Sequence, residues 1–188
     1  MSRKAYLILE NGTVFEGKSF GAEKETMGEL VFTTAMTGYL ETLTDPSYFG
    51  QVVIQTFPLI GNYGVIPSDF ESKKPDLKAY IVRNWCQEPS NFRCEGVLDT
   101  FLKDSDVPGL YDIDTRRLTR IVREYGVMNC KLTYSLDNLD KDIEELKSYK
   151  VTDAVKSVTT DKKELFESET HKKNVVLMDF GAKDNIRR

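Results

Sequence analysis

Histidine is nearly absent from this sequence, and cysteine is sparse. His171 is the one histidine among 188 residues, and the three cysteines, Cys86, Cys94 and Cys130, are widely spaced. A cysteine nucleophile needs a base, usually histidine, within hydrogen-bonding reach, and none of these cysteines lies in a Gly-x-Cys-x-Gly turn. Zinc sites need closely spaced ligand pairs, which are also missing. We therefore expect no catalytic residue and no metal ligand here, and we interpret His171 as a solvated residue.

Nucleotide-binding loops and long apolar runs are also lacking. The glycine-dense turn Gly61–Gly64 is not followed by the Lys-Ser/Thr pair of a phosphate-binding loop, so a structural turn is the better interpretation. No apolar stretch approaches the length of a bilayer span. The short apolar run near the N-terminus ends on Glu10, too early for a signal peptide. Three widely spaced cysteines favour reduced thiols, so we expect a cytoplasmic protein.

An excess of positive charge is missing too. The net charge is −4 and the isoelectric point is near 5.2, which argues against general binding to nucleic acid or to an anionic membrane. The composition, 40% hydrophobic and 30% charged, is ordinary for a soluble globular protein. The chain is long enough to bury a core without disulfides or metals.

Runs of β-branched and aromatic residues predict several strands. The strand candidates are 6–10, 13–16, 28–34, 51–57, 78–82 and 127–134. Asn11-Gly12 predicts a tight hairpin turn between the first two of these. A short helix is expected at Gly38–Leu43, and it must end before Asp45-Pro46 because a residue preceding proline avoids the helical conformation. Further helices are expected near 97–102 and over 138–149.

The clearest helix signal begins at Asp114, which is placed to cap the first free N–H groups, and ends at Gly126. Its apolar stripe consists of Leu118, Ile121, Val122 and Tyr125. The opposite face carries Arg116, Arg120 and Arg123. Such a basic face is usually solvated or paired with nearby acids, but it could also dock an acidic partner or a phosphate, and both interpretations stay open.

Composition divides the chain into three parts. Residues 1–152 carry the strand and helix signals of an α/β domain, whereas 153–173 are polar and charged and are predicted to be a linker. The apolar run Asn174–Phe180 shows no alternation, as expected for a strand buried on both faces of a parallel sheet. We therefore predict that 174–188 form the first strand and turn of a truncated second α/β domain.

Five segments of the sequence match the order and spacing of a known family. They are Leu30–Gln51, Phe57–Gly64, Ser90–Arg93, Ile113–Arg120 and Asp179–Lys183. In this arrangement they resemble the small, glutamine-dependent subunit of carbamoyl-phosphate synthetase, and the resemblance covers essentially the whole chain. It implies a layered β/β/α N-terminal domain, followed by the truncated start of a class I glutamine amidotransferase domain.

The resemblance also implies a function. The chain would help to form the site for L-glutamine and would dock a large subunit, which makes carbamoyl phosphate from bicarbonate, ammonia and ATP. ATP and magnesium would be used by the large subunit, so no cofactor is expected in this chain. The family's catalytic Cys and its His-Glu pair have no counterpart here, so the fragment alone should be inactive. Whether the pathway is that of pyrimidines, arginine or both is left open.

One substrate-binding residue follows from the resemblance. In the family, the serine of a Leu-Thr-Asp-Pro-Ser-Tyr motif contacts glutamine, and in this chain that serine is Ser47. The residues alone favour a turn serine that satisfies local backbone groups. The arginine face of Arg116, Arg120 and Arg123 is the candidate subunit interface. The alternative function is a stand-alone, non-catalytic binding module that uses this face on an acidic partner.

Overall fold

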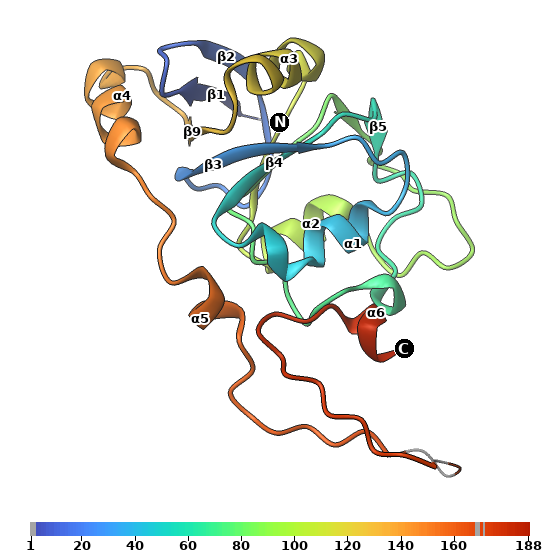
Figure 1. Cartoon of the computed structure of the whole chain (residues 1–188). Coiled ribbons are helices and arrows are strands. Elements are labelled where there is room, and N and C mark those ends of the chain that lie inside the picture. Colours follow the sequence, from blue (N-terminus) through green and yellow to red (C-terminus); the bar gives the residue numbers. More distant parts are fainter. Residues whose placement is uncertain (1–2, 168–169, 171) are drawn as a thin grey trace.

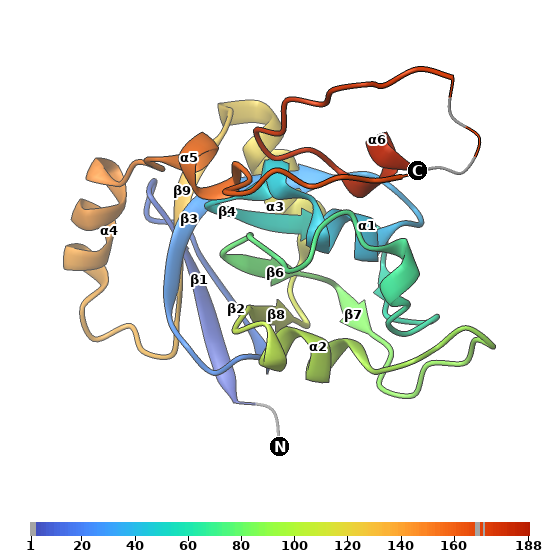
Figure 2. The same cartoon turned by 90° about the horizontal axis from the view of Figure 1, so that it is seen from below.

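The computed structural model describes residues 3–167, 170 and 172–188. Within these residues, seven strands form a closed barrel in the order β1-β2-β8-β6-β4-β3-β9. Figure 1 labels β1, β2, β3, β4 and β9 of this barrel, and β6 and β8 are labelled in Figure 2. They are β1 (Lys4–Leu9), β2 (Val14–Gly21), β3 (Thr26–Thr33), β4 (Gln51–Gln55), β6 (Ala79–Ile81), β8 (Pro108–Tyr111) and β9 (Met128–Thr133). Two short strands, β5 (Leu59–Ile60) and β7 (Asn84–Trp85), pair separately.

The predicted hairpin between β1 and β2 is confirmed. Gly12 adopts φ +83° in the turn, and its N–H donates to the carbonyl of Leu9 at 2.9 Å. The second strand does not end at Gly17 as expected. It continues to Gly21 because its second half pairs with β8, starting from Lys18 opposite Tyr111.

The barrel closes where β1 pairs with β9, and it mixes two pairing patterns. The pairs β3–β4, β4–β6 and β6–β8 are parallel, whereas the pairs that involve β1, β2 or β9 are antiparallel. Strands β3 and β4 are interior strands of the row, since each pairs on both sides. Strand β8 was not predicted because it opens with Pro108-Gly109 and carries no β-branched residue.

Two cores lie on the two sides of the barrel wall. Successive residues of β4 point in opposite directions, so Val52 faces the barrel interior and Val53 faces outward. Helices α1 (Tyr39–Thr44) and α2 (Leu98–Asp104) cover the outer face, below β3 and β4 in Figure 1. Helix α3 (Thr115–Tyr125) contributes Leu118 to the interior core from the other side. The expectation of a sheet-rich α/β domain is confirmed.

Helix α3 begins and ends as its sequence predicts. The Asp114 carboxylate accepts a hydrogen bond from the N–H of Arg117 at 2.9 Å, and Gly126 follows the last residue with φ +87°. Leu118 and Val122 are buried, but Tyr125 is 68% exposed, so its assignment to the buried stripe was wrong. Tyr125 is the last residue of the helix and lies past the turns that contact the core.

The chain beyond the barrel is mostly irregular. Helix α4 (Leu139–Ser148) falls within the range predicted for a helix and packs on β1 and β9. Two single-turn 3₁₀ helices, η1 (Pro46–Tyr48) and η2 (Pro67–Asp69), and two short helices, α5 (Ala154–Val158) and α6 (Asp184–Arg187), complete the described elements. Figure 2 shows the C-terminal segment, which runs from residue 153 to 188, arching away from the barrel and returning to it at α6.

The strand predicted over Asn174–Phe180 is not present. These residues are extended without pairing to any described strand, and Val175 and Val176 are 90% and 88% exposed. A strand buried on both faces needs neighbouring strands, and this segment has none within the described residues. The start of an amidotransferase domain is therefore not seen as a folded unit, and the domain boundaries at 152 and 173 stay predictions. His171 lies outside the described residues.

Candidate functional site

The turn that carries Ser47 follows directly from α1. Pro46 opens the 3₁₀ turn, where its fixed φ suits a first helical position and its missing N–H leaves no donor unpaired. The Asp45 carboxylate accepts the N–H of Ser47 at 2.9 Å, and the Asp45 carbonyl accepts the N–H of Tyr48 at 3.1 Å. The turn is thus stabilised by Asp45.

The Ser47 side chain is left exposed by this arrangement. Its hydroxyl forms no hydrogen bond with a described residue, so it is not the group that satisfies the turn. The turn-serine interpretation assigned to Ser47 a role that Asp45 performs. The hydroxyl of Ser47 is therefore free to donate and to accept a hydrogen bond at the surface, on a backbone that Asp45 holds in place.

The residue before this turn anchors it to the rest of the domain. Thr44 is fully buried, and its hydroxyl donates to the carbonyl of Leu40 at 2.7 Å while accepting the N–H of Glu71 at 2.8 Å. The hydroxyl of Ser72 donates to the Thr44 carbonyl at 2.6 Å. These bonds tie α1, the Ser47 turn and the segment around Glu71 into one unit.

The C-terminal segment docks against the same unit. The ammonium group of Lys183 lies 2.6 Å from Asp45, and the hydrogen bond to this carboxylate raises the pKa of Lys183 above its usual range. Asp45 therefore holds Ser47 with one oxygen and Lys183 with the other. Next along the chain, the N–H of Asp184 donates to the Glu71 carbonyl at 2.8 Å. Residues at 45–47 and 183–185, far apart in sequence, meet at one place.

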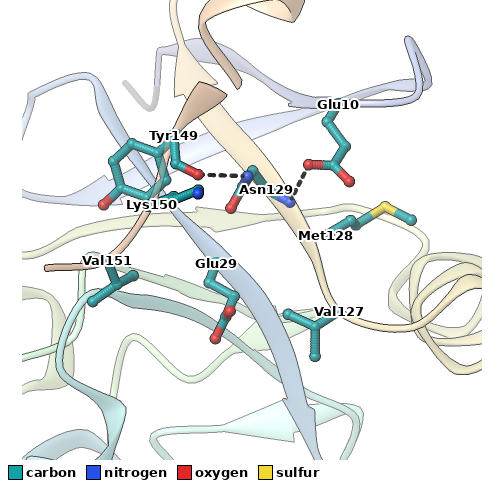
Figure 3. Close-up of a pocket in the computed structure, with 8 residues that line it drawn as sticks. All are labelled: Glu10, Glu29, Val127, Met128, Asn129, Tyr149, Lys150 and Val151. Carbon is teal, nitrogen blue, oxygen red and sulfur yellow. Dashed lines mark hydrogen bonds between the residues drawn. The ribbon is translucent and has the colours of Figure 1, made fainter. Parts of the chain in front are cut away.

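A cleft of about 420 Å³ lies elsewhere, between strands β3 and β9 and the residues that follow α4 (Figure 3). Three of its polar residues, Glu10, Glu29 and Asn129, already have structural partners. The N–H of Asn129 donates to Glu10 at 3.0 Å, and the Asn129 amide group donates to the carbonyls of Leu146 and Tyr149 at 2.9 and 3.1 Å. Glu29 accepts a hydrogen bond from Gln51 at 2.7 Å. These contacts fasten the end of α4 to β9, and none of the predicted site residues lines this cleft.

A second cleft, of about 340 Å³, lies beside α1 and is bordered by Phe92, which is 96% exposed. The loop that carries Phe92 is held in place because the guanidinium group of Arg93 lies 2.5 Å from the carboxylate of Asp69. Among the described residues, no cluster of three histidine, cysteine or acidic side chains could hold a metal ion in either cleft or outside them. No helix in the described part of the chain is long and apolar enough to cross a membrane.

Comparison with known proteins decides the family. The model for "Carbamoyl-phosphate synthase small chain, CPSase domain" matches residues 7–132, which include the whole barrel wall from β1 to β9 except its outermost residues. The chain belongs to this family.

Relatives among the curated proteins agree with that assignment. The carbamoyl phosphate synthase small chain of Clostridium perfringens (strain 13 / Type A) is 51% identical over 185 residues, and that of Streptococcus agalactiae serotype III (strain NEM316) is 46% identical over 186. Both matches cover 98% of this chain but only 52% and 51% of the relative. The chain thus spans about half the length of these relatives and corresponds to the N-terminal domain of the small subunit.

One solved structure shares part of the backbone path. An aminopeptidase from Aneurinibacillus sp. strain AM-1 matches with a TM-score of 0.41 and 16% identity, covering 71% of this chain and 32% of the aminopeptidase. This similarity is too low to carry an argument about fold or function.

The arginine face of this small-chain domain is fully presented to solvent. Arg116, Arg120 and Arg123 are exposed, and none of them forms an ion pair with a described residue. Their neighbour Arg117 instead lies over the Phe15 ring at 5.2 Å. The basic face was expected to be either solvated or paired with nearby acids, and pairing with a described acid is not found. The subunit interface stays a prediction.

Of the three cysteines, Cys130 is the one whose surroundings make it a poor nucleophile. Cys130 is completely buried in the barrel, and burial raises the pKa of its thiol far above the usual range. Cys86 and Cys94 are half-buried, and each thiol donates to a carbonyl at 3.3 Å. Thiolate, the reactive form, is therefore strongly disfavoured at Cys130.

Proposed function

We propose that this domain helps to form the glutamine site of a glutamine-hydrolysing carbamoyl-phosphate synthetase, a ligase, and that it docks the large subunit of that enzyme. In this proposal the large subunit uses ATP and magnesium to make carbamoyl phosphate from bicarbonate and ammonia. The observation that carries the substrate role is the free, exposed hydroxyl of Ser47 on a turn held by Asp45.

Ser47 is suited to bind a polar amino acid for two reasons. Its hydroxyl can both donate and accept, which matches the amide, ammonium and carboxylate groups of glutamine. Its backbone is already fixed by Asp45 and Thr44, so little conformational freedom has to be lost when a ligand binds. A hydroxyl on a preorganised turn binds more tightly than one on a mobile loop.

The proposal divides the chemistry between two parts of the small subunit. This chain offers no exposed thiol beside a base among its described residues. The catalytic Cys and His-Glu pair are therefore assigned to the half of the relatives that this chain does not cover. Residues 174–188 would start the domain that continues into that half, and their exposed apolar side chains would be buried by it.

The stand-alone binding module is the less favoured alternative. The relatives match 98% of this chain, well past the arginine helix. Since the match includes the C-terminal segment and not the barrel alone, the arginine face is better explained as one surface of a larger enzyme.

The glutamine role is tested by Ser47→Ala in the full-length small subunit assembled with its large partner. Losing one hydrogen bond to a charged or strongly polar group costs ~1.5–3 kcal/mol, so the glutamine KM should rise roughly ten- to a hundredfold. Because Ser47 would touch substrate and not the reacting centre, kcat should change little. The measurement is glutamine-dependent carbamoyl phosphate synthesis over a range of glutamine concentrations.

Free ammonia provides the internal control, because it bypasses the glutamine site. Ammonia-dependent synthesis by the Ser47→Ala enzyme should match that of the wild type. The 188-residue chain alone serves as the blank and should release no ammonia from glutamine. An unchanged glutamine KM would refute the substrate role, and equal loss of the ammonia-driven reaction would assign the damage to assembly.

A further inference from the structure

Glu71 is a buried carboxylate whose acceptor positions are taken up by the C-terminal segment. The residue is only 6% exposed. One carboxylate oxygen accepts the backbone N–H of Asn185 at 3.0 Å, and the other accepts the Asn185 side-chain amide at 2.5 Å. The two residues are separated by 114 positions in the sequence. The carboxylate of Glu71 thus accepts hydrogen bonds from both the backbone and the side chain of one asparagine.

The backbone of Glu71 completes the contact. Its carbonyl accepts the N–H of Asp184 at 2.8 Å, and its own N–H donates to the Thr44 hydroxyl at 2.8 Å. Thr44 precedes Asp45, which holds the N–H of Ser47. Glu71 is therefore linked in one direction to the Ser47 turn and in the other to residues 184 and 185.

Burial makes this contact strong and selective. Hydrogen bonds to an ionised acceptor are about twice as strong as those between neutral groups, and leaving a buried carboxylate without donors is costly. Glu71 forms no ion pair with a described residue, so its charge is met by these N–H donors. The segment is held by a specific hydrogen-bond pattern at Glu71, in addition to the Lys183–Asp45 ion pair.

We infer that Glu71 is a positioning residue: by gripping Asn185 it fixes the C-terminal segment against the Ser47 turn and so sets where Ser47 stands relative to the rest of the small subunit. This inference rests on the proposed glutamine role of Ser47. A glutamine site built from two halves of a chain works only when both halves hold their relative position, since a shift of about 1 Å in a site can cost roughly a hundredfold in rate.

The contact itself is tested on the 188-residue chain by amide hydrogen exchange. Glu71→Gln keeps the size of the side chain but removes the negative charge that strengthens both hydrogen bonds from Asn185. Asn185→Asp places a second carboxylate opposite Glu71. Each change should speed exchange at the amides of residues 184 and 185 by roughly tenfold or more, while the amides of β3 and β4 exchange as in the wild type.

The double variant Glu71→Gln with Asn185→Asp restores complementarity, because the new amide can donate to the new carboxylate. Its exchange at 184 and 185 should return toward the wild-type rate, which a mere loss of packing would not do. Glu164→Gln is the matched control, since Glu164 contacts the same segment through Arg187 but from the surface. The proposed contact between Glu71 and Asn185 would be refuted if exchange stayed unchanged in both single variants. It would also be refuted if the double variant did not restore the wild-type rate.

The consequence for Ser47 is tested in the full-length subunit with its large partner. Both single variants should raise the glutamine KM by roughly tenfold while ammonia-dependent synthesis stays at the wild-type level, and the double variant should recover. If Ser47→Ala raises the KM but Glu71→Gln loosens the segment without raising it, the positioning role is wrong and the glutamine role stands. If neither raises it, the glutamine role itself fails.

Discussion

The barrel and the C-terminal segment use similar apolar residues with opposite outcomes. In β4, Val52, Val53 and Ile54 are completely buried, whereas Val175 and Val176 in the run Asn174–Phe180 lie open to solvent. The difference is the presence of neighbours: β4 pairs with β3 and β6, and nothing described pairs with 174–180. An apolar run shows that a segment can be buried, but burial itself needs a partner surface.

The two regions also differ in what holds them together. The barrel rests on two continuous hydrophobic cores, one inside the wall and one under α1 and α2. The last residues of the chain rest instead on polar contacts, chiefly Lys183 with Asp45 and Asn185 with Glu71. Apolar burial stabilises without regard to direction, while these polar contacts specify one docking geometry.

The largest expected effect contrasts one apolar deletion in each region. Leu30→Ala opens a cavity in the barrel interior and should lower the free energy of unfolding by about 2–5 kcal/mol. Val176→Ala removes an exposed side chain and should change it by no more than about 0.5 kcal/mol. Urea unfolding followed by circular dichroism measures both. A loss of similar size in Val176→Ala would show that this segment is buried in solution.

A smaller effect is expected from ion pairs in the two regions. Asp142 of α4 is 5% exposed and pairs with Lys131 of β9 at 2.6 Å. Asp142→Ala should cost about 1–3 kcal/mol because it leaves a largely buried ammonium group without its partner. Glu164→Ala breaks the exposed pair with Lys73 and should cost less than about 1 kcal/mol. Equal losses in the same unfolding assay would contradict the contrast.

The Lys131 pair also predicts a pH dependence. Burial lowers the pKa of Lys131, but its hydrogen bond to Asp142 and the nearby negative charge raise it more, so the net pKa lies above the usual range. A raised pKa means that the folded state holds the proton more tightly than the unfolded state. The contribution of this pair is therefore complete at neutral pH and is lost as the pH rises through the raised pKa. The difference between wild type and Asp142→Ala should shrink there.

The smallest effect on folding is expected at the arginine face. Replacing Arg116, Arg120 and Arg123 with Glu should leave the free energy of unfolding within about 0.5 kcal/mol, since these side chains are exposed. The association rate with the large subunit should nevertheless fall by roughly tenfold or more if the face docks it. Replacing the exposed Lys156, Lys162 and Lys163 with Glu makes the same charge change in the C-terminal segment and should leave association unaffected. If both triple variants slowed association with the large subunit equally, the result would reflect a general effect of charge and not docking by the arginine face.

Local signals in the sequence were sufficient for some elements. Helix α3 was predicted from its Asp114 cap, its apolar stripe and Gly126, and the first hairpin from Asn11-Gly12, because each of these signals acts within a few residues. Strand β8 was missed since Pro108-Gly109 resembles a turn and is kept in the barrel only by β2 and β6. The strand expected at 174–180 is not formed among the described residues, since no neighbouring strand is there to pair with it, and its place in a second domain stays a prediction.

The candidate site was only half visible in the sequence. Ser47 was found through resemblance, and the Asp-Pro-Ser spacing could have suggested that Asp45 caps the turn. The contacts of Glu71 with Asn185 could not be predicted from either segment, because both residues look like ordinary surface polar residues until the fold brings them together.

Barrel closure sets a condition on how this chain acquires its structure during synthesis. The first strand finds its second neighbour only in β9, with Tyr6 opposite Thr133. To form contacts between such distant residues, the chain must first close a long loop, and the lost entropy is offset only once the contacts have formed. Folding is therefore slower than in chains with mostly local contacts. On the ribosome, β1 and β2 can form their hairpin early, but the free edge of β1 must wait until residue 133 has emerged. During that interval the exposed edge is open to pairing with other chains, so the newly made domain depends on prompt completion of its own sequence.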